Sequence, residues 1–328
     1  MRSTSLRCAA FLAGASLLLT GCGGKQSVLD PHSKPARQIV HLWWGMLAAA
    51  VVVFAGALVL LFIAWRRRDR EGLPVLGKDE GVSTGMVVAF GIVIPVLALS
   101  VLFWVSDLEV GKTVEAPAAK DSQMRMTVIG HQWWWEARYP GTTAVTANEI
   151  HIPTDTRIDV LLESTDVIHS FWVPALNKKM DMLPGHPNHL LLYSNRAGVF
   201  RGQCAEFCGL QHANMSLEVV AQPPAQFRAW LANEAKPASA PASPEFMSEQ
   251  CASCHTIRGT AARGTIGPDL THVGGRKTLA GLTIPNDPAH MAQWISNPQG
   301  IKPGARMPGL GLSPQEVRRL VTFLEGLR

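Results

Sequence analysis

Two long stretches without charged side chains stand out in the first third of the chain. Residues 39–65 and 81–106 contain no Asp, Glu, Lys or Arg. Each exceeds the roughly 20 apolar residues that a helix needs to cross the hydrocarbon core of a bilayer. Tryptophans, whose rings favour the headgroup layer, lie near both ends of the first stretch. The pattern predicts two transmembrane helices, and Pro95 in the second is tolerated because neighbouring helices compensate for it.

The loop between these helices, residues 66–80, begins with four arginines in five positions. A short arginine-rich loop is retained in the cytoplasm by the positive-inside rule. Residues 22–38 and everything after Asp107 are then expected on the outer side. This predicts a multi-pass protein of the bacterial inner membrane, with its later domains in the periplasm.

The first 21 residues are predicted to be an export signal. Arginines precede an apolar run that is too short to span a bilayer. The run ends in Leu19-Thr20-Gly21-Cys22, which resembles a bacterial lipobox, and cleavage there would leave Cys22 as an acylated N-terminus. An ordinary signal peptide and an additional membrane helix are the alternatives.

Beyond the second apolar stretch the hydrophobic pattern changes. Residues 121–222 carry short alternating runs separated by Pro, Gly and Asn turns, which are typical of a β-sandwich. Residues 223–242 are expected to form a short amphipathic helix and then a Pro/Ala linker that cannot pack a core. Residues 243–328 are expected to form a small all-α domain, because Ser313 and Glu316 make a capping box before a helix with one apolar face.

The composition excludes nucleic acid as a partner and leaves four cysteines for chemistry. The formal charge of +5 is mild for 328 residues and is not gathered in one basic stripe. Of the six cysteines, Cys8 leaves with the signal and Cys22 takes the lipid. The remaining four form two close pairs, Cys204/Cys208 and Cys251/Cys254.

The segment from Cys204 to Met215 combines two thiols, an imidazole and a thioether between two strand-like runs. Copper prefers soft sulfur ligands mixed with imidazole, and two cysteines at this spacing can bridge two metals. A distant histidine must complete the set, and His169 lies on another strand-like run. A Cys204/Cys208 disulfide and a Cys2His2 zinc site are the alternatives, but neither uses Met215.

The motif Cys-x-Glu-x-Cys-Gly-x-x-His-x-x-Met, preceded by His-Ser-Phe-x-x-Pro, resembles the CuA domain of haem-copper oxidase subunit II. The resemblance implies a cupredoxin fold in which two cysteines bridge two coppers. It further implies that the Glu206 carboxylate reaches a Mg²⁺ at the interface with the catalytic subunit, and that electrons from cytochrome c arrive at Trp133. The copper ligands that it implies are Cys204, Cys208, His169, His212, Met215 and the Glu206 carbonyl.

Two positions depart from that family. His186 stands where the family commonly has an arginine, so the contact made by that arginine is not carried over. The family also often has a glutamate just before its second span, linked to proton uptake in the partner subunit. Ser83 or Thr84 falls near that place, and Asp79 and Glu80 are the nearest acids, so the role is assigned to none of them.

The run Cys251-Ala252-Ser253-Cys254-His255 is the motif for covalent attachment of a c-type haem. Its two thiols would bond the haem vinyl groups and His255 would bind the iron. Met307, held between loop residues, is the predicted sixth ligand, and His/Met ligation raises a haem potential. Met291 is the alternative, but it lies in a helix-like stretch and is expected in the core. The segment resembles a class I cytochrome c.

These features predict the electron-entry subunit of a terminal respiratory oxidase, which passes electrons from the c haem to CuA and on to a catalytic subunit that reduces oxygen and pumps protons. The resemblance implies catalytic subunit I and subunit III as partners, and cytochrome c or the cytochrome bc1 complex as donor. A CuA-type nitric oxide reductase is the alternative. A copper-delivery or redox-sensing lipoprotein would need no fixed two-metal site and no haem, and quinol oxidase subunits lack the copper ligands present here.

The two outer domains carry opposite net charge. Residues 121–233 contain eight basic and ten acidic side chains, whereas residues 243–328 contain nine basic and six acidic ones. The domains are therefore expected to attract each other. Because they are tethered, this weak attraction is expected to act even at physiological salt.

Overall fold

The computed structural model describes residues 24, 26–67, 80–111, 121–239, 241–248 and 250–328, and these fall into two compact units with boundaries near residues 36 and 116. The predicted export signal, the predicted lipid attachment at Cys22, and Asp79 with most of the predicted cytoplasmic loop lie outside the described residues.

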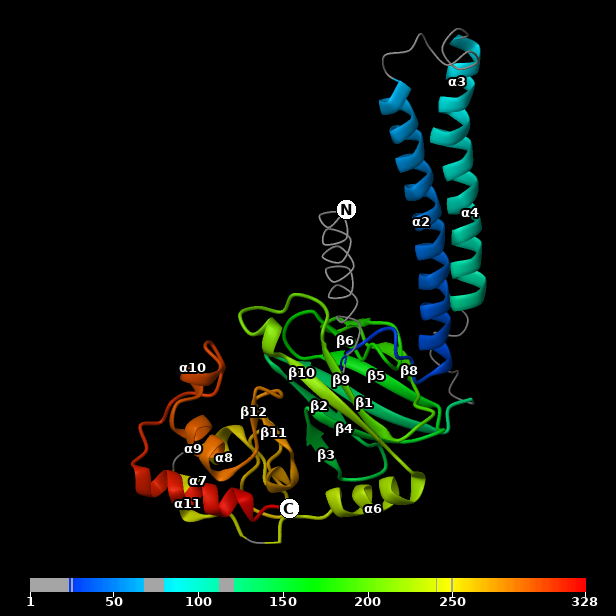
Figure 1. The fold of residues 1–328 in the computed structure, drawn as a ribbon. Helices are drawn as coiled ribbons and strands as arrows, with labels where there is room; N and C mark the ends of the chain where they lie inside the picture. Colours follow the sequence, from blue (N-terminus) through cyan, green and yellow to red (C-terminus); the bar gives the residue numbers. More distant parts are fainter. Residues whose placement is uncertain (1–23, 25, 68–79, 112–120, 240, 249) are drawn as a thin grey trace, which may run out of the picture. The chain divides into compact units, whose positions relative to one another are not determined.

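The first unit consists of two long apolar helices (Figure 1). Both are long and apolar enough to cross a membrane, as the charge-free stretches predict. The first helix runs from Lys34 to Arg67 and contains the whole predicted span of residues 39–65. In the second helix a π-helical turn precedes Pro95, because proline cannot accommodate the regular i−4 carbonyl contact. The segments are α2 (Lys34–Arg67), α3 (Glu80–Val88), η2 (Ala89–Val93), α4 (Ile94–Val105) and η3 (Ser106–Gly111).

The second unit begins with a cupredoxin-like sandwich of two five-stranded sheets. One sheet has the order β3-β2-β1-β5-β8 and the other β4-β10-β9-β6-β7. The pairs β1/β5 and β4/β10 are parallel, and the other pairs are antiparallel. The strands are β1 (Met124–His131), β2 (Trp134–Arg138), β3 (Val145–Ala147), β4 (Glu149–Pro153), β5 (Ile158–Ser164), β6 (His169–Trp172), β7 (Met180–Met182), β8 (Asn188–Leu192), β9 (Gly198–Cys204) and β10 (Ser216–Gln222).

The core between the sheets is apolar and reaches the predicted copper loop. Val160 and Leu162, two residues apart on β5, are both fully buried, as the alternating pattern predicts. Trp135 packs edge-on against Phe171 with ring centroids 5.7 Å apart. The same core includes Cys204, Cys208 and Met215. Helix α6 (Pro224–Glu234) adds Phe227 and Trp230 to it.

The C-terminal part is the predicted small helical domain. The capping box between Ser313 and Glu316 is present at the start of α11, and the apolar face of that helix is buried. The segment predicted as a Pro/Ala linker is hydrogen-bonded to this domain: the Ala238 N–H donates to the Arg258 carbonyl, and His272 Nε2 donates to the Lys236 carbonyl. The elements are α7 (Pro244–Ser248), α8 (Cys251–Cys254), η5 (Val273–Gly275), β11 (Thr278–Leu279), β12 (Ile284–Pro285), α9 (Pro288–Ser296), α10 (Pro298–Ile301) and α11 (Pro314–Glu325).

Candidate copper and haem sites

The copper loop, residues 204–215, connects the antiparallel neighbours β9 and β10. The Cys204 N–H donates to the Met215 carbonyl over 2.9 Å, which closes the base of the loop. Gly209 has a φ of +111°, a conformation open to glycine, and a Cβ there would lie 3.0 Å from the Trp133 ring. Since β6 pairs with β9, placing Phe171 opposite Cys204, the strand that starts at His169 lies beside the loop.

The loop and β6 bring all the predicted copper donors together. Among the described residues, His169, Cys204 and Cys208 form the group of side chains that could hold a metal ion, with ligand atoms within 4.8 Å of one another. Both cysteines are buried and free. The other donors surround the two cysteine sulfurs. Cys204 Sγ lies 3.8 Å from His169 Nδ1 and 3.2 Å from the Glu206 carbonyl oxygen. Cys208 Sγ lies 3.6 Å from His212 Nδ1 and 3.7 Å from Met215 Sδ.

Asp166 orients the His169 ring. Its carboxylate accepts a hydrogen bond from His169 Nε2 at 2.9 Å, so Nδ1 is left facing Cys204. Burial raises the pKa of Asp166, but hydrogen bonds from His169 and from the Gln132 and Val167 N–H groups outweigh it, and the pKa lies below its usual range. Gly130 leaves room for the ring, because a Cβ there would lie 2.8 Å from His169 Cδ2.

The donor set fits a pair of copper ions. A hydrogen bond between the thiols lowers the pKa of Cys204 and raises that of Cys208, and a bound metal would hold both cysteines as thiolates. Two sulfurs of cysteine, one thioether and two imidazoles whose Nδ1 atoms face the sulfurs make a soft set that suits copper. The disulfide alternative is not present, because both thiols are free.

Three consecutive tryptophans surround this site in different ways. The Trp133 indole N–H donates to the Cys208 carbonyl over 2.9 Å, next to a predicted ligand. Trp135 is fully buried in the sandwich core. Trp134 stacks on His131, with parallel rings 4.1 Å apart. The predicted arrival point, Trp133, therefore contacts the copper loop directly, and the Trp135 indole also donates to the Met215 carbonyl over 3.4 Å.

The other residues discussed from the sequence lie outside the group of buried metal donors. The Glu206 side chain is exposed, and it does not belong to the metal-binding group found among the described residues. His186 is also exposed. Glu80 opens α3, and Ser83 and Thr84 follow within it.

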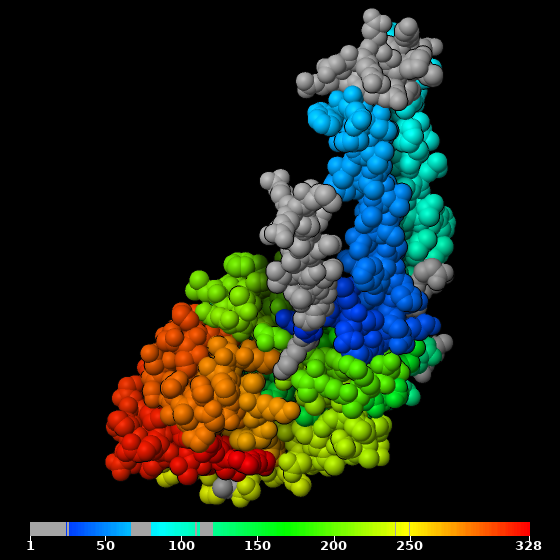
Figure 2. Space-filling model, in the orientation of Figure 1, coloured from blue at the N-terminus to red at the C-terminus, as the bar shows by residue number. Residues whose placement is uncertain are grey.

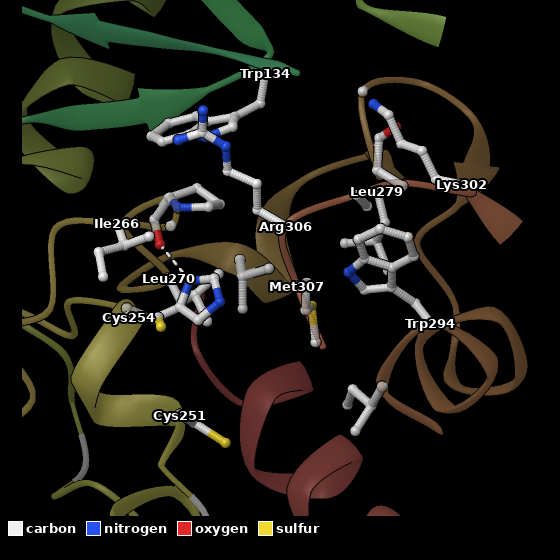
Figure 3. A pocket seen from close by; sticks show the side chains of 18 of the residues that line it. Trp134, Cys251, Cys254, Ile266, Leu270, Leu279, Trp294, Lys302, Arg306 and Met307 are labelled. Carbon is white, nitrogen blue, oxygen red and sulfur yellow. Dashed lines mark hydrogen bonds between the residues drawn. The ribbon is translucent and has the colours of Figure 1, made fainter. Parts of the chain in front are cut away.

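The predicted haem residues line one cavity of about 250 Å³ (Figure 3). Cys251 and Cys254 are the two ends of α8, and His255 follows directly. His255 Nδ1 donates to the Pro268 carbonyl over 2.8 Å, which fixes the ring and leaves Nε2 free to bind iron. Met307 also lines the cavity. Met291 lines it too, but at 2% exposed it is part of the domain core, as expected.

Two glycines show that this cavity is built around the haem motif. A Cβ at Gly267 would lie 2.5 Å from His255 Cε1, and a Cβ at Gly264 would lie 2.4 Å from the Cys254 backbone. Burial lowers the pKa of His255 below its usual range, so the imidazole is neutral and able to bind a metal. Two thiols, a neutral imidazole and a thioether around an apolar cavity fit a c-type haem.

The copper domain supplies one wall of the haem cavity. His131, Gln132, Trp133, Trp134 and Asn148 line it together with residues of the cytochrome segment. Figure 3 shows Trp134 and Arg306 projecting into the same side of the cavity. In Figure 2 the orange cytochrome segment lies against the green copper domain without a visible gap.

Comparisons with known proteins identify both outer domains. A family model described as cytochrome c oxidase subunit II, periplasmic domain, matches residues 144–222, and one described as cytochrome c matches residues 242–328. Cytochrome c oxidase subunit 2 of Bacillus subtilis is 30% identical, over 97% of this chain and 96% of its own. The chain belongs to the cytochrome c oxidase subunit 2 family.

Another relative matches over nearly the full length, and a solved structure matches over the copper domain. Cytochrome c oxidase subunit 2 of Alkalihalophilus pseudofirmus is 29% identical, over 97% of this chain and 96% of its own. The solved periplasmic domain of subunit II of the cytochrome oxidase of Bradyrhizobium japonicum is 27% identical, with a TM-score of 0.34, over 36% of this chain and 96% of that one. Family membership makes this chain an electron-entry subunit of an oxidoreductase complex, with a copper domain, a haem domain and a catalytic partner subunit.

The sequence reasoning missed several residues that shape the two sites. Asp166 and Gly130 position His169, and Lys302 and Arg306 connect the haem segment to the copper domain. Of these residues, only Asp166 is marked by a local feature of the sequence, because it precedes His169 by three residues. The others act across large separations in sequence, which no motif marks.

Proposed function

We propose that this chain receives electrons at its cytochrome domain and passes them through its copper loop to the catalytic subunit of an oxygen-reducing, proton-pumping oxidase. The observation that carries the proposal is the shared wall: the loop that lines the haem cavity, residues 131–134, also holds the copper loop through the Trp133 indole. When bound, the haem and the copper pair would each take up and release one electron at a time.

The chain's own residues would hold these groups. Cys251, Cys254, His255 and Met307 would hold the haem, and Trp133 would be the residue through which electrons reach the copper loop. Asp166 would keep His169 in the tautomer that binds copper. The copper ligands proposed are Cys204, Cys208, His169, His212, Met215 and the Glu206 carbonyl.

The setting of the chain is part of the proposal. The signal would end at residue 21, Cys22 would carry lipid, and residues 39–65 and 81–106 would anchor the chain in the bacterial inner membrane with both redox domains in the periplasm. Subunits I and III would be its partners, a Mg²⁺ would bind the Glu206 carboxylate at their interface, and cytochrome c or the cytochrome bc1 complex would be the donor. An intact mass that retains residues 1–21 without acyl groups would refute the lipid anchor.

Stopped-flow reduction of the purified chain by reduced cytochrome c tests the electron route. Metal analysis should first give two coppers and one haem per chain. The haem band should then be reduced before the copper band. In the variant Cys251→Ser/Cys254→Ser, which cannot attach haem, copper reduction should slow by about tenfold or more, because the entry route is removed. Copper reduction at the wild-type rate in that variant would show that electrons enter elsewhere.

A further inference from the structure

Lys302 is a buried lysine at the junction of the copper and cytochrome domains. Its side chain is 3% exposed and its ammonium group donates three hydrogen bonds. The acceptors are the carbonyls of Trp133 at 2.9 Å, Asn214 at 2.9 Å and Ala280 at 3.1 Å. An ammonium group has three N–H donors, so each one is used.

The three carbonyls belong to three separate segments of the chain. Trp133 lies between β1 and β2, and its indole bonds the copper loop. Asn214 lies in the copper loop itself, between the proposed ligands His212 and Met215. Ala280 belongs to the cytochrome domain. One side chain therefore joins the β1–β2 connection that contains Trp133, the copper loop and the cytochrome domain.

A cation at this place is costly unless it has a specific partner for each proton. Burial lowers the pKa of Lys302 to about 8, so the group is still charged at neutral pH. Among the described residues no carboxylate pairs with it, and the carbonyl oxygens alone offset its loss of hydration. An apolar residue would fill the same space without that cost, which points to a role in specific positioning.

The rest of the loop, residues 302–307, makes the same connection. Gln211 Nε2 donates to the Pro303 carbonyl over 2.6 Å. Arg306 donates to Gln132 Oε1 over 2.7 Å and lies 3.6 Å from the Asp166 carboxylate. The loop ends at Met307, the proposed iron ligand. The segment that carries this ligand is therefore the segment that is fastened to the copper loop.

We propose that Lys302 is a positioning residue that holds the Met307 loop against the copper loop and so fixes the contact across which electrons pass. The proposal rests on the function proposed above. The step it serves is a one-electron transfer in which the haem is oxidised and the copper pair is reduced; no proton moves, and the external donor reduces the haem again. Lys302 lines the haem cavity, but its ammonium group is used entirely by the three carbonyls, and it acts through them.

Hydrogen exchange and flash-induced electron transfer on the full purified chain test this role with three variants. Lys302→Met removes the ammonium group and keeps the length of the side chain. Lys302→Arg keeps the charge, but its planar guanidinium cannot serve three converging carbonyls in the same way. Lys277→Met removes an exposed lysine of the same domain and is the matched control.

In Lys302→Met, amide exchange of residues 131–135 and 211–215 should rise by about tenfold or more, because the docked state opens more often. The haem-to-copper rate should fall by a similar factor and become dependent on salt, since the domains must then meet by diffusion. A purely structural lysine would not change the salt dependence. The exchange and electron-transfer rates of Lys302→Arg should lie between those of wild type and Lys302→Met. The rates of Lys277→Met should equal those of wild type.

Exchange and electron-transfer rates within twofold of wild type in a folded Lys302→Met chain would overturn the proposal. Faster exchange with an unchanged transfer rate would overturn the positioning role. If Lys302→Met fails to bind haem and copper, Lys302→Arg is judged by the same two measurements. A wild-type chain without haem-to-copper transfer would refute the proposed function instead, and the exchange data would still test the attachment by Lys302.

Discussion

The copper domain should lose stability in mild acid because of one buried histidine that is not a proposed metal ligand. His151 lies on β4, where its ring stacks on Trp230 of α6 with parallel planes 4.0 Å apart. Its Nδ1 donates to Gln222 Oε1 over 3.1 Å. Burial lowers the pKa of His151 from 6.5 to about 4, with the Gln222 hydrogen bond opposing. Protonation of this ring must therefore oppose folding.

The sign and size of the effect follow from the two pKa values. Between pH 4 and 6.5 the unfolded chain binds a proton at His151 that the folded chain does not, so the free energy of unfolding rises with pH there and falls on acidification. Each pH unit in this window is worth about 1.4 kcal/mol. Acidification from pH 7 to pH 4.5 should thus remove roughly 2 kcal/mol of stability through this group alone.

Urea unfolding of the purified chain, followed by tryptophan fluorescence from pH 4.5 to 7.5, measures the effect. The variant His151→Gln retains a side-chain N–H donor, now from an amide, and its side chain cannot be protonated. The difference in unfolding free energy between wild type and variant should change by roughly 2 kcal/mol over this range, because all other titrating groups cancel. The variant His186→Gln, at an exposed histidine, is the control and should change little.

A difference between wild type and His151→Gln that stays constant from pH 4.5 to 7.5 would refute this reasoning. It would mean that His151 is protonated in the folded chain as easily as in the unfolded one. A change of similar size in His186→Gln would also refute it, because the effect would then not depend on burial against Trp230.

Three further predictions concern the two sites. Asp166→Asn should weaken copper binding by about 10- to 100-fold in competition with a chelator, because His169 loses its charged partner, whereas Asp181→Asn, at an exposed position, should not. Met215→Leu should shift the copper reduction potential in a redox titration while metal analysis still gives two coppers, since a thioether is the weakest ligand of the set. Gly267→Ala should destabilise the haem domain by about 1–3 kcal/mol in thermal melts followed at the haem band, because its Cβ would lie 2.5 Å from His255; Gly275→Ala, with open space around it, should have little effect.

The parts of the fold that depend on local pattern could be predicted from the sequence. The charge-free stretches, the alternating runs and the capping box at Ser313 each specify an element within a few residues, and the fold class is confirmed. The first helix, Lys34–Arg67, extends beyond the predicted membrane span of residues 39–65 at both ends. Hydropathy marks where lipid begins, whereas the helix itself begins where Ser33 accepts a hydrogen bond from the Ala36 N–H.

The candidate sites also contain residues that local sequence identifies and residues that it does not. Five of the copper donors fall on one loop and the haem motif is contiguous, so spacing alone brings them to attention. The role of Asp166 depends on a turn before β6. The role of Lys302 depends on contacts with Trp133 and Asn214, which precede it by 169 and 88 positions in the sequence. Opposite net charge suggested that the two domains meet. It did not reveal that a buried ammonium group on carbonyls, with Arg306 beside Asp166, forms the junction.

The shared wall of the haem cavity sets an order of assembly. Residues 131–134 and Asn148 precede Cys251 by about a hundred positions, so during synthesis they emerge first. The copper domain can therefore complete its sandwich before the haem motif is available, and it then acts as a template on which the last segment closes. A destabilised copper domain would for that reason appear as a defect in haem maturation, even when the motif itself is intact.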